Sequence, residues 1–285
     1  MRKLGRGVAA LFGAGFAYAA FVYLTLPDVR PLRTTNPETT AFMELRARKA
    51  RAKGAEPKKI QRWVPYNRIS GNLKRAVLVA EDSGFWQHEG IEFEQMRESI
   101  EANLERLEFA RGGSTITQQL AKNLFLSPSK NPVRKLREIL IARRLEAELT
   151  KQRILELYLN LIEWGDDIYG AEAAARRYFG KSAADLSPQE SALLAGAIIN
   201  PHVHSPGHPT ARLRRRQQMI MRRMGAATPP PAVAEAPGAK PADIPGVPVP
   251  DAATPPPAGA TPPPTLPGDP VPALPAPPCE RPPCG

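Results

Sequence analysis

Two acidic residues, Glu81 and Asp82, directly follow an almost wholly apolar run from Ala76 to Ala80. The pattern from Leu73 to Ala80 predicts a helix that is buried along its length, so both carboxylates fall near its carboxyl end. The helix dipole repels anions there by about 0.3 to 1 kcal/mol, and partial burial disfavours ionisation further. Both effects raise a carboxylate's affinity for a proton, as a general base near neutral pH requires. A surface acid pair at a helix end fits this stretch equally well.

A second polar stretch, RGGSTITQQLAKNLFL, begins at Arg111. Gly112 and Gly113 interrupt the chain before a new helix, which Ser114 or Thr115 can cap. Thr115 also fits a capping box with the glutamine three residues later. A glycine-led helix start suits an anionic ligand, because free backbone amides and the positive end of the dipole point toward it. A plain turn explains the glycine pair as well. The polar face of this helix carries Thr115, Gln118 or Gln119, and Lys122.

A third stretch places one carboxylate among cations. Asn131 and Pro132 predict the N-cap and first residue of a helix that continues as VRKLREILIARRLEAEL. Glu138 lies four residues after Arg134 and three after Lys135, so it is either a site residue or a partner in an ordinary intrahelical ion pair worth about 0.2 to 0.5 kcal/mol. The buried face of this helix is predicted to consist of Leu136, Ile139 and Leu140.

Five segments in order resemble the motifs of the family 51 peptidoglycan glycosyltransferases. EDSGFWQHEG, at 81–90, is similar to the first motif, E-D-x-x-F-x-x-H-x-G, at every fixed position. The other four are GGSTITQQLAKN, RKLREILIA, KQRILELYLNLIEWG and AARRYFGKSAADLSPQESALLAG. The resemblance covers 62–224, and the short chain with its IINP segment looks like the monofunctional, membrane-anchored branch.

This resemblance implies a mainly α, lysozyme-like domain that polymerises lipid II into β-1,4 glycan with inversion at the sugar C1. Glu81 would be the general base toward the acceptor 4-hydroxyl, and Glu138 a second carboxylate on the acceptor side. Fixed donors would stabilise the departing lipid pyrophosphate. The substrate-binding candidates are Ser114, Gln118, Lys122, Asn123, Lys130, Arg134 and Lys135. The structural or auxiliary candidates are Asp82, Phe85 and His88.

No tightly bound cofactor is expected, and whether a divalent cation bridges the substrate pyrophosphate stays open. His202, His204 and His208 lie in a proline-rich loop and are interpreted as surface histidines, so no protein metal site is predicted. Cys279 and Cys284 fit no common metal spacing and are either idle thiols or a short terminal disulfide.

The two ends of the chain differ in composition from the middle. Residues 1–6 hold three basic side chains, and the uncharged run 7–26 is long enough for a transmembrane anchor. A cleaved signal peptide ending near Ala19 is the alternative. A basic juxtamembrane segment, 27–59, then leads to the glycosyltransferase domain, 60–224, and a disordered Pro-rich tail, 225–285. These predictions place the protein in the bacterial cytoplasmic membrane with its catalytic domain in the periplasm.

The net charge of +11 gathers in 41–75 and 210–224. Anionic lipid headgroups are the expected counterpart of an exported, tethered chain, whereas nucleic acid is not, and solvated helix faces remain an alternative. The expected partners are lipid II, the growing glycan strand, and cell-wall synthesis or division proteins. A transpeptidase is rejected because K-T-G is missing. A lysozyme-like hydrolase and a non-enzymatic envelope scaffold stay as alternatives.

Overall fold

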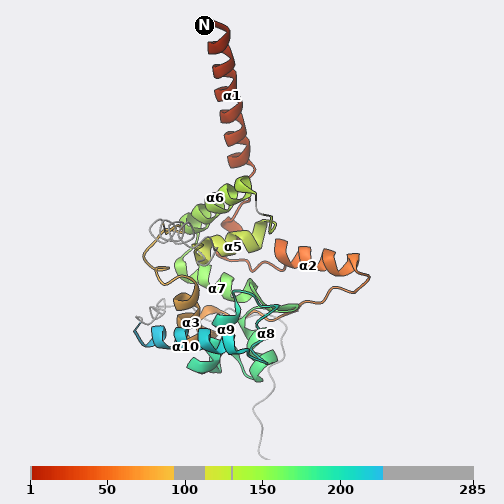
Figure 1. Ribbon diagram of the computed structural model, residues 1–285, viewed down its shortest axis with the longest axis vertical. Coiled ribbons are helices and arrows are strands. Elements are labelled where there is room, and N and C mark those ends of the chain that lie inside the picture. The colour runs from red at the N-terminus through yellow and green to blue at the C-terminus, as the bar shows by residue number, and fades with distance from the viewer. Residues whose placement is uncertain (1, 93–112, 130, 227–285) are drawn as a thin grey trace, which may run out of the picture. The chain divides into compact units, whose positions relative to one another are not determined.

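The computed structural model describes residues 2–92, 113–129 and 131–226, and these ranges are mainly helical, as predicted (Figure 1). The chain divides into two units, Met1–Ala234 and Glu235–Gly285, and every described residue lies in the first. The helices are α1 (Arg2–Leu24), α2 (Ala41–Ala52), α3 (Gly71–Glu81), α5 (Ile116–Phe125), α6 (Pro132–Glu148), α7 (Lys151–Leu161), α8 (Ala171–Phe179), α9 (Pro188–Ala197) and α10 (Ala211–Ala226). Short 3-10 helices span Arg30–Arg33, Tyr66–Arg68 and Ala183–Asp185.

Side-chain caps set where most of these helices begin. The Thr115 hydroxyl accepts a hydrogen bond from the backbone of Gln118, whose side chain accepts one from Thr115 in return, and Ser187 and Glu190 form the same box at α9. Thr150 caps α7, and Asn131 caps α6 ahead of Pro132. Each cap satisfies backbone N–H groups that the first helical turn leaves free, which is worth about 1 kcal/mol. The caps predicted for α5 and α6 are confirmed.

The core is built around α3 and α5. Helix α3 packs against α9 and α10, and α5 packs against α6 and α7 (Figure 1). Leu73, Ala76 and Val77 of α3 are completely buried, so the predicted burial of this helix is confirmed. Full burial of a large apolar side chain stabilises a fold by about 1.5 to 3 kcal/mol. The two helices that bear the first two motifs are therefore held rigidly in the protein interior.

The predicted buried face of α6 is wrong. Leu136 is 49% exposed, and Ile139 and Leu140 are only half-buried. Helix α6 instead turns Glu138 and the residues three, four and seven positions later into the protein. A carboxylate can occupy this face because two cations of the same helix pair with it. The buried residues of α6 are Glu138, Ile141, Ala142 and Leu145.

A small sheet closes one side of the domain. Its strands are β1 (Ile60–Gln61), β2 (Glu163–Gly165) and β3 (Ile168–Tyr169), in the order β1-β3-β2. Strand β3 pairs in parallel with β1 and antiparallel with β2. Buried Asn160 of α7 ties the segment after β1 to the helix, since its side chain exchanges hydrogen bonds with the backbone N–H and C=O of Val64. Strands of two or three residues are too short to show the alternation that predicts a strand.

The segment predicted as an anchor, 7–26, forms most of α1 and the turn after it. Among the described residues, no helix combines the length and the apolar character needed to cross a membrane. Arg144 of α6 donates hydrogen bonds to the carbonyls of Tyr23 and Leu26, so the end of α1 is joined to α6. Residues 227–285, which hold nearly all of the predicted tail and both cysteines, lie outside the described residues.

Candidate active site

Glu81 is the last residue of α3, and its side chain points inward. Its Oε2 accepts a hydrogen bond from Gln119 Nε2 at 3.1 Å, and its Oε1 lies 3.3 Å from Arg216 Nη2. The Glu81 side chain is only 13% exposed. The carboxylate therefore lies between α5 and α10, which contribute its two hydrogen-bond donors.

Burial raises the pKa of the Glu81 carboxyl above its ordinary value, and the neighbouring Asp82 carboxylate adds to the rise. Gln119 and Arg216 act in the opposite direction, because both favour the ionised form. The balance leaves a carboxylate that takes up a proton more readily than an exposed glutamate. This is the property that a general base needs near neutral pH.

Asp82, in contrast to Glu81, makes hydrogen bonds that hold neighbouring segments together. It caps the end of α3 and accepts hydrogen bonds from His88 Nε2 at 2.9 Å and from the backbone N–H of Ile116 at 2.9 Å. His88 Nδ1 in turn accepts from Gly90 N at 3.0 Å. Asp82 thereby joins the end of α3, the 83–90 loop and the start of α5. The ring of Phe85 is fully buried beneath this loop, with the ammonium of Lys151 4.5 Å from its centroid.

Glu138 and its cations lie at the junction of α5 and α6. Arg134 and Lys135 both form ion pairs with the buried Glu138. Lys135 Nζ also reaches Ser114 Oγ at 3.1 Å and Gln118 Oε1 at 3.5 Å. Four predicted site residues are therefore brought together around Lys135, and the cations outnumber the one carboxylate.

Lys122, on α5, faces the same region. Burial lowers the pKa of its ammonium, and the neighbouring Arg134 and Lys135 act in the same direction, whereas Glu138 and Glu81 oppose it. Within the described ranges no carboxylate lies within 4 Å of Lys122 Nζ, although the Phe42 ring centroid is 5.9 Å away. A half-buried cation without a close carboxylate is well suited to an anionic ligand.

Three residues of this site were not predicted in these roles. Tyr158, completely buried on α7, donates to Gln119 Oε1 at 2.9 Å, and this bond turns the amide nitrogen of Gln119 toward Glu81. Burial raises the pKa of Tyr158 well above its ordinary value, so the phenol stays a donor. Gln118, the predicted ligand, is buried in the capping box, while Gln119 reaches the carboxylate. Arg216 is 135 positions from Glu81, and no local signal marks it.

Asn123 and Lys130 are the two remaining residues that were predicted to bind the substrate. Asn123 is half-buried and donates from Nδ2 to the Gln119 carbonyl at 2.8 Å, within its own helix. Lys130 lies outside the described residues.

The histidines need one correction. His204 was expected at the surface but is buried, because the 200–204 turn folds it back with its backbone N–H on the Asn200 carbonyl. His202 contacts Glu163 and Asp166, and His208 is exposed.

A possible metal cluster joins Asp82, His88 and Glu92, whose ligand atoms lie within 4.8 Å of one another. Its histidine is a poor metal ligand as placed. The Gly90 N–H donates to Nδ1, so Nε2 carries the proton that it shares with Asp82, and both ring nitrogens are occupied. The cluster is explained by the structural role of Asp82 and His88.

A helical domain that holds a carboxylate of raised pKa near a group of cations is typical of enzymes that deprotonate a reactant while an anionic group is bound or released. The transglycosylase family model matches residues 49–225. Because that match spans more than half of the chain, the chain belongs to the transglycosylase family.

Similar proteins carry the same family name in their descriptions. The biosynthetic peptidoglycan transglycosylase of Nitrosospira multiformis is 46% identical over 195 residues, which cover 68% of this chain and 85% of that protein. The protein of the same name from Thiobacillus denitrificans is 43% identical over 229 residues, or 80% of this chain and 97% of the relative. The one from Aromatoleum aromaticum is 52% identical over 166 residues, or 58% and 72%.

Proposed function

We propose that this protein is a peptidoglycan glycosyltransferase, which polymerises lipid II into β-1,4-linked glycan strands and releases undecaprenyl pyrophosphate. Membership of the transglycosylase family and the names of the relatives support the activity. The observation that carries the mechanism is the inward-facing Glu81, held by Gln119 and Arg216. A hydrolytic or scaffold function is not favoured by these relatives.

In the proposed reaction the Glu81 carboxylate accepts the proton of the acceptor 4-hydroxyl. The acceptor oxygen forms a bond to C1 of the donor sugar, and the bond from C1 to the pyrophosphate oxygen breaks with inversion. The leaving pyrophosphate takes the electron pair of that bond. A positioned general base typically accelerates such a step by about 10² to 10⁴-fold.

The cations near α5 stabilise the negative charge that develops on the leaving group. Lys122 contributes most, because it is half-buried and has no carboxylate within 4 Å among the described residues. Arg134 and Lys135 share their charge with Glu138. We therefore assign Glu138 to the acceptor side of the site, where it positions these two cations. Ser114 and Gln118 support Lys135 from the start of α5.

We further propose that no cofactor is tightly bound and that any divalent cation arrives with the substrate pyrophosphate. The protein would act at the bacterial cytoplasmic membrane, with 7–26 as anchor and the catalytic domain in the periplasm. Support comes from apolar side chains on the outside of α1, among them Leu11, Phe16 and Leu24. A full-length chain that stays in the supernatant when bacterial membranes are sedimented would contradict the anchor.

The activity is tested by offering the purified full-length protein two substrates. With lipid II we expect a ladder of glycan products, and with purified sacculi we expect no soluble fragments. The reason is that the site is arranged to activate a sugar hydroxyl and stabilise a pyrophosphate, and only lipid II offers the latter. Release of fragments from sacculi without consumption of lipid II would instead identify a hydrolase.

Arg216 should set the lower end of the pH range of activity. Its guanidinium favours the ionised form of Glu81, so Arg216→Gln raises the pKa of that carboxyl further. The base is active when ionised, and activity is lost as pH falls through this pKa. The acid limb of the kcat/KM profile is therefore expected to move to higher pH in the variant, with activity recovered on the alkaline side.

The matched control is Arg215→Gln, which removes the same charge from an exposed neighbouring position on α10. Its profile should overlay that of the unmodified protein. An acid limb that moves equally in both variants would mean that Arg216 acts only through the overall charge of the helix.

A further inference from the structure

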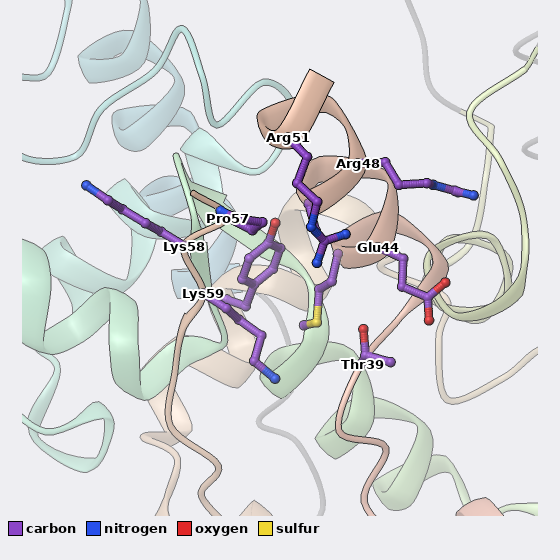
Figure 2. Close-up of a pocket in the computed structure, with 10 residues that line it drawn as sticks. Thr39, Glu44, Arg48, Arg51, Pro57, Lys58 and Lys59 are labelled. Carbon is purple, nitrogen blue, oxygen red and sulfur yellow. The ribbon is translucent and has the colours of Figure 1, made fainter. Parts of the chain in front are cut away.

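A cavity of about 390 Å³ lies apart from the candidate active site, and neither Glu81 nor Lys122 lines it (Figure 2). Its walls come from Thr39 before α2, from α2 itself, from the segment that leads into β1, and from strand β3. Cavities of this size accommodate small ligands. The residues that give it its chemical character are Glu44, Arg48, Arg51, Lys58, Lys59 and Tyr169.

The cavity is strongly basic. Figure 2 shows Arg51 reaching down from α2 into the space between Glu44 and the segment that carries Lys58 and Lys59, whereas Arg48 and Lys58 extend outward on opposite sides. In the part of the chain that the structure describes, Arg48, Arg51 and Lys58 form no ion pair within 4 Å. Lys59 donates to the Glu38 carbonyl at 2.6 Å, which leaves its charge uncompensated. The lining of the cavity thus includes four basic side chains and one carboxylate, that of Glu44.

Tyr169 adds a donor inside this basic wall. Its side chain is only 2% exposed, yet its hydroxyl has no hydrogen-bond partner among the described residues. Buried hydroxyls are nearly always hydrogen-bonded, so an unpaired one that lines a cavity indicates a place for a ligand. Burial raises the pKa of this phenol, which therefore stays protonated and can donate. The carboxylate of the nearby Glu163 would repel an anion, but its charge is compensated by Arg46, which pairs with it at 3.0 Å.

We propose that this cavity binds a phosphate group, with Arg51 and the Tyr169 hydroxyl as its direct donors and the charge of the other basic side chains that line the cavity attracting it. A phosphate suits the site better than a carboxylate, because it carries more charge and offers more acceptor oxygens to a cluster of donors. The phosphate can belong to the headgroup of an anionic lipid or to a free phosphate or pyrophosphate ion. The site is separate from the proposed catalytic residues, and the proposal does not rest on the proposed function.

The test is a titration of the full-length protein in detergent, followed by calorimetry. One arm uses inorganic pyrophosphate, and the other uses a short-chain phosphatidylglycerol with short-chain phosphatidylcholine as the neutral comparison. Because the cations near Glu81 also attract pyrophosphate, each titration is repeated in the Lys122→Met chain. Binding that survives this substitution and is weakened by Tyr169→Phe is assigned to the cavity.

Tyr169→Phe is expected to weaken this binding about tenfold, since it removes one hydrogen bond to a charged group. Arg48→Gln with Arg51→Gln should weaken it at least as much and reduce its dependence on salt. The matched control, Lys49→Gln with Lys53→Gln, removes the same charge from exposed positions of the same region that do not line the cavity. It should bind like the unmodified protein.

Binding in the pyrophosphate arm alone, or in the phosphatidylglycerol arm alone, supports the proposal and identifies the source of the phosphate. No binding in either arm would overturn it. Equal losses in the cavity variant and the control variant would also overturn it, because they would indicate a diffuse basic surface. The arginine substitutions lie on exposed side chains, so their outcome does not depend on whether Tyr169→Phe folds normally.

Discussion

Glu81→Gln is expected to lower the rate of lipid II polymerisation by about 10² to 10⁴-fold, the contribution of a positioned general base. Glutamine keeps the size of the side chain, and it can still accept a hydrogen bond from Gln119. It cannot take up the proton of the acceptor hydroxyl at neutral pH. The rate is measured as the appearance of glycan from fluorescent lipid II under single-turnover conditions, so that product release does not mask the chemical step.

Glu89→Gln is the control, because Glu89 is exposed in the same loop, and the substitution makes the same chemical change. It should retain the full rate, and thermal unfolding should show that both variants are folded. If Glu81→Gln polymerised lipid II as fast as the control, Glu81 would not be the base. The proton would then have to go to another group, and the buried position of Glu81 would be purely structural.

The elements of this site could be predicted because their signals are local. The apolar run before Glu81 predicts a buried helix, and a buried helix places the carboxylate at its end. The pair Thr115 and Gln118 predicts the start of α5, since a capping box needs only four residues. Burial and capping chemistry within one segment are thus readable without knowledge of the fold.

The face of α6 could not be predicted from hydrophobicity alone. The sequence offers an apolar stripe that includes Leu136, but α6 buries the stripe that carries Glu138. The burial of Glu138 is tolerated because Arg134 and Lys135 neutralise its carboxylate. The ammonium of Lys135 also donates a hydrogen bond to the Ser114 hydroxyl. Such a network depends on how α5 meets α6, which no pattern within α6 contains.

The hydrogen-bond partners of Glu81 could not be predicted from the sequence pattern either. Gln119 and Gln118 are adjacent and chemically identical, but the capping box holds the side chain of Gln118, and Tyr158 orients that of Gln119 toward the carboxylate. Arg216 lies in a run of arginines whose pattern is typical of a solvent-exposed helix face. Only its position on α10, packed against α3, distinguishes it from its neighbours.

Lys122→Met is the second substitution for which we expect a large loss, about 10² to 10³-fold in kcat, the effect of removing one preorganised electrostatic donor. Methionine preserves the apolar stem of the lysine next to Phe42 and removes the charge. If Lys122 stabilises charge that develops only in the transition state, kcat and kcat/KM should fall by the same factor. Steady-state kinetics with lipid II over a range of concentrations measures both.

The pH profile separates this role from simple substrate binding. Burial lowers the pKa of Lys122, so its positive charge is lost as pH rises through a value below the ordinary lysine range. The unmodified protein should therefore lose activity on the alkaline side, and this limb should be absent in Lys122→Met. Lys122→Arg, which keeps the charge at every accessible pH, should also lack the limb but retain more activity. A Lys122→Met chain with an unchanged kcat and a raised KM would assign Lys122 to ground-state binding of the pyrophosphate, and the leaving group would need another source of stabilisation.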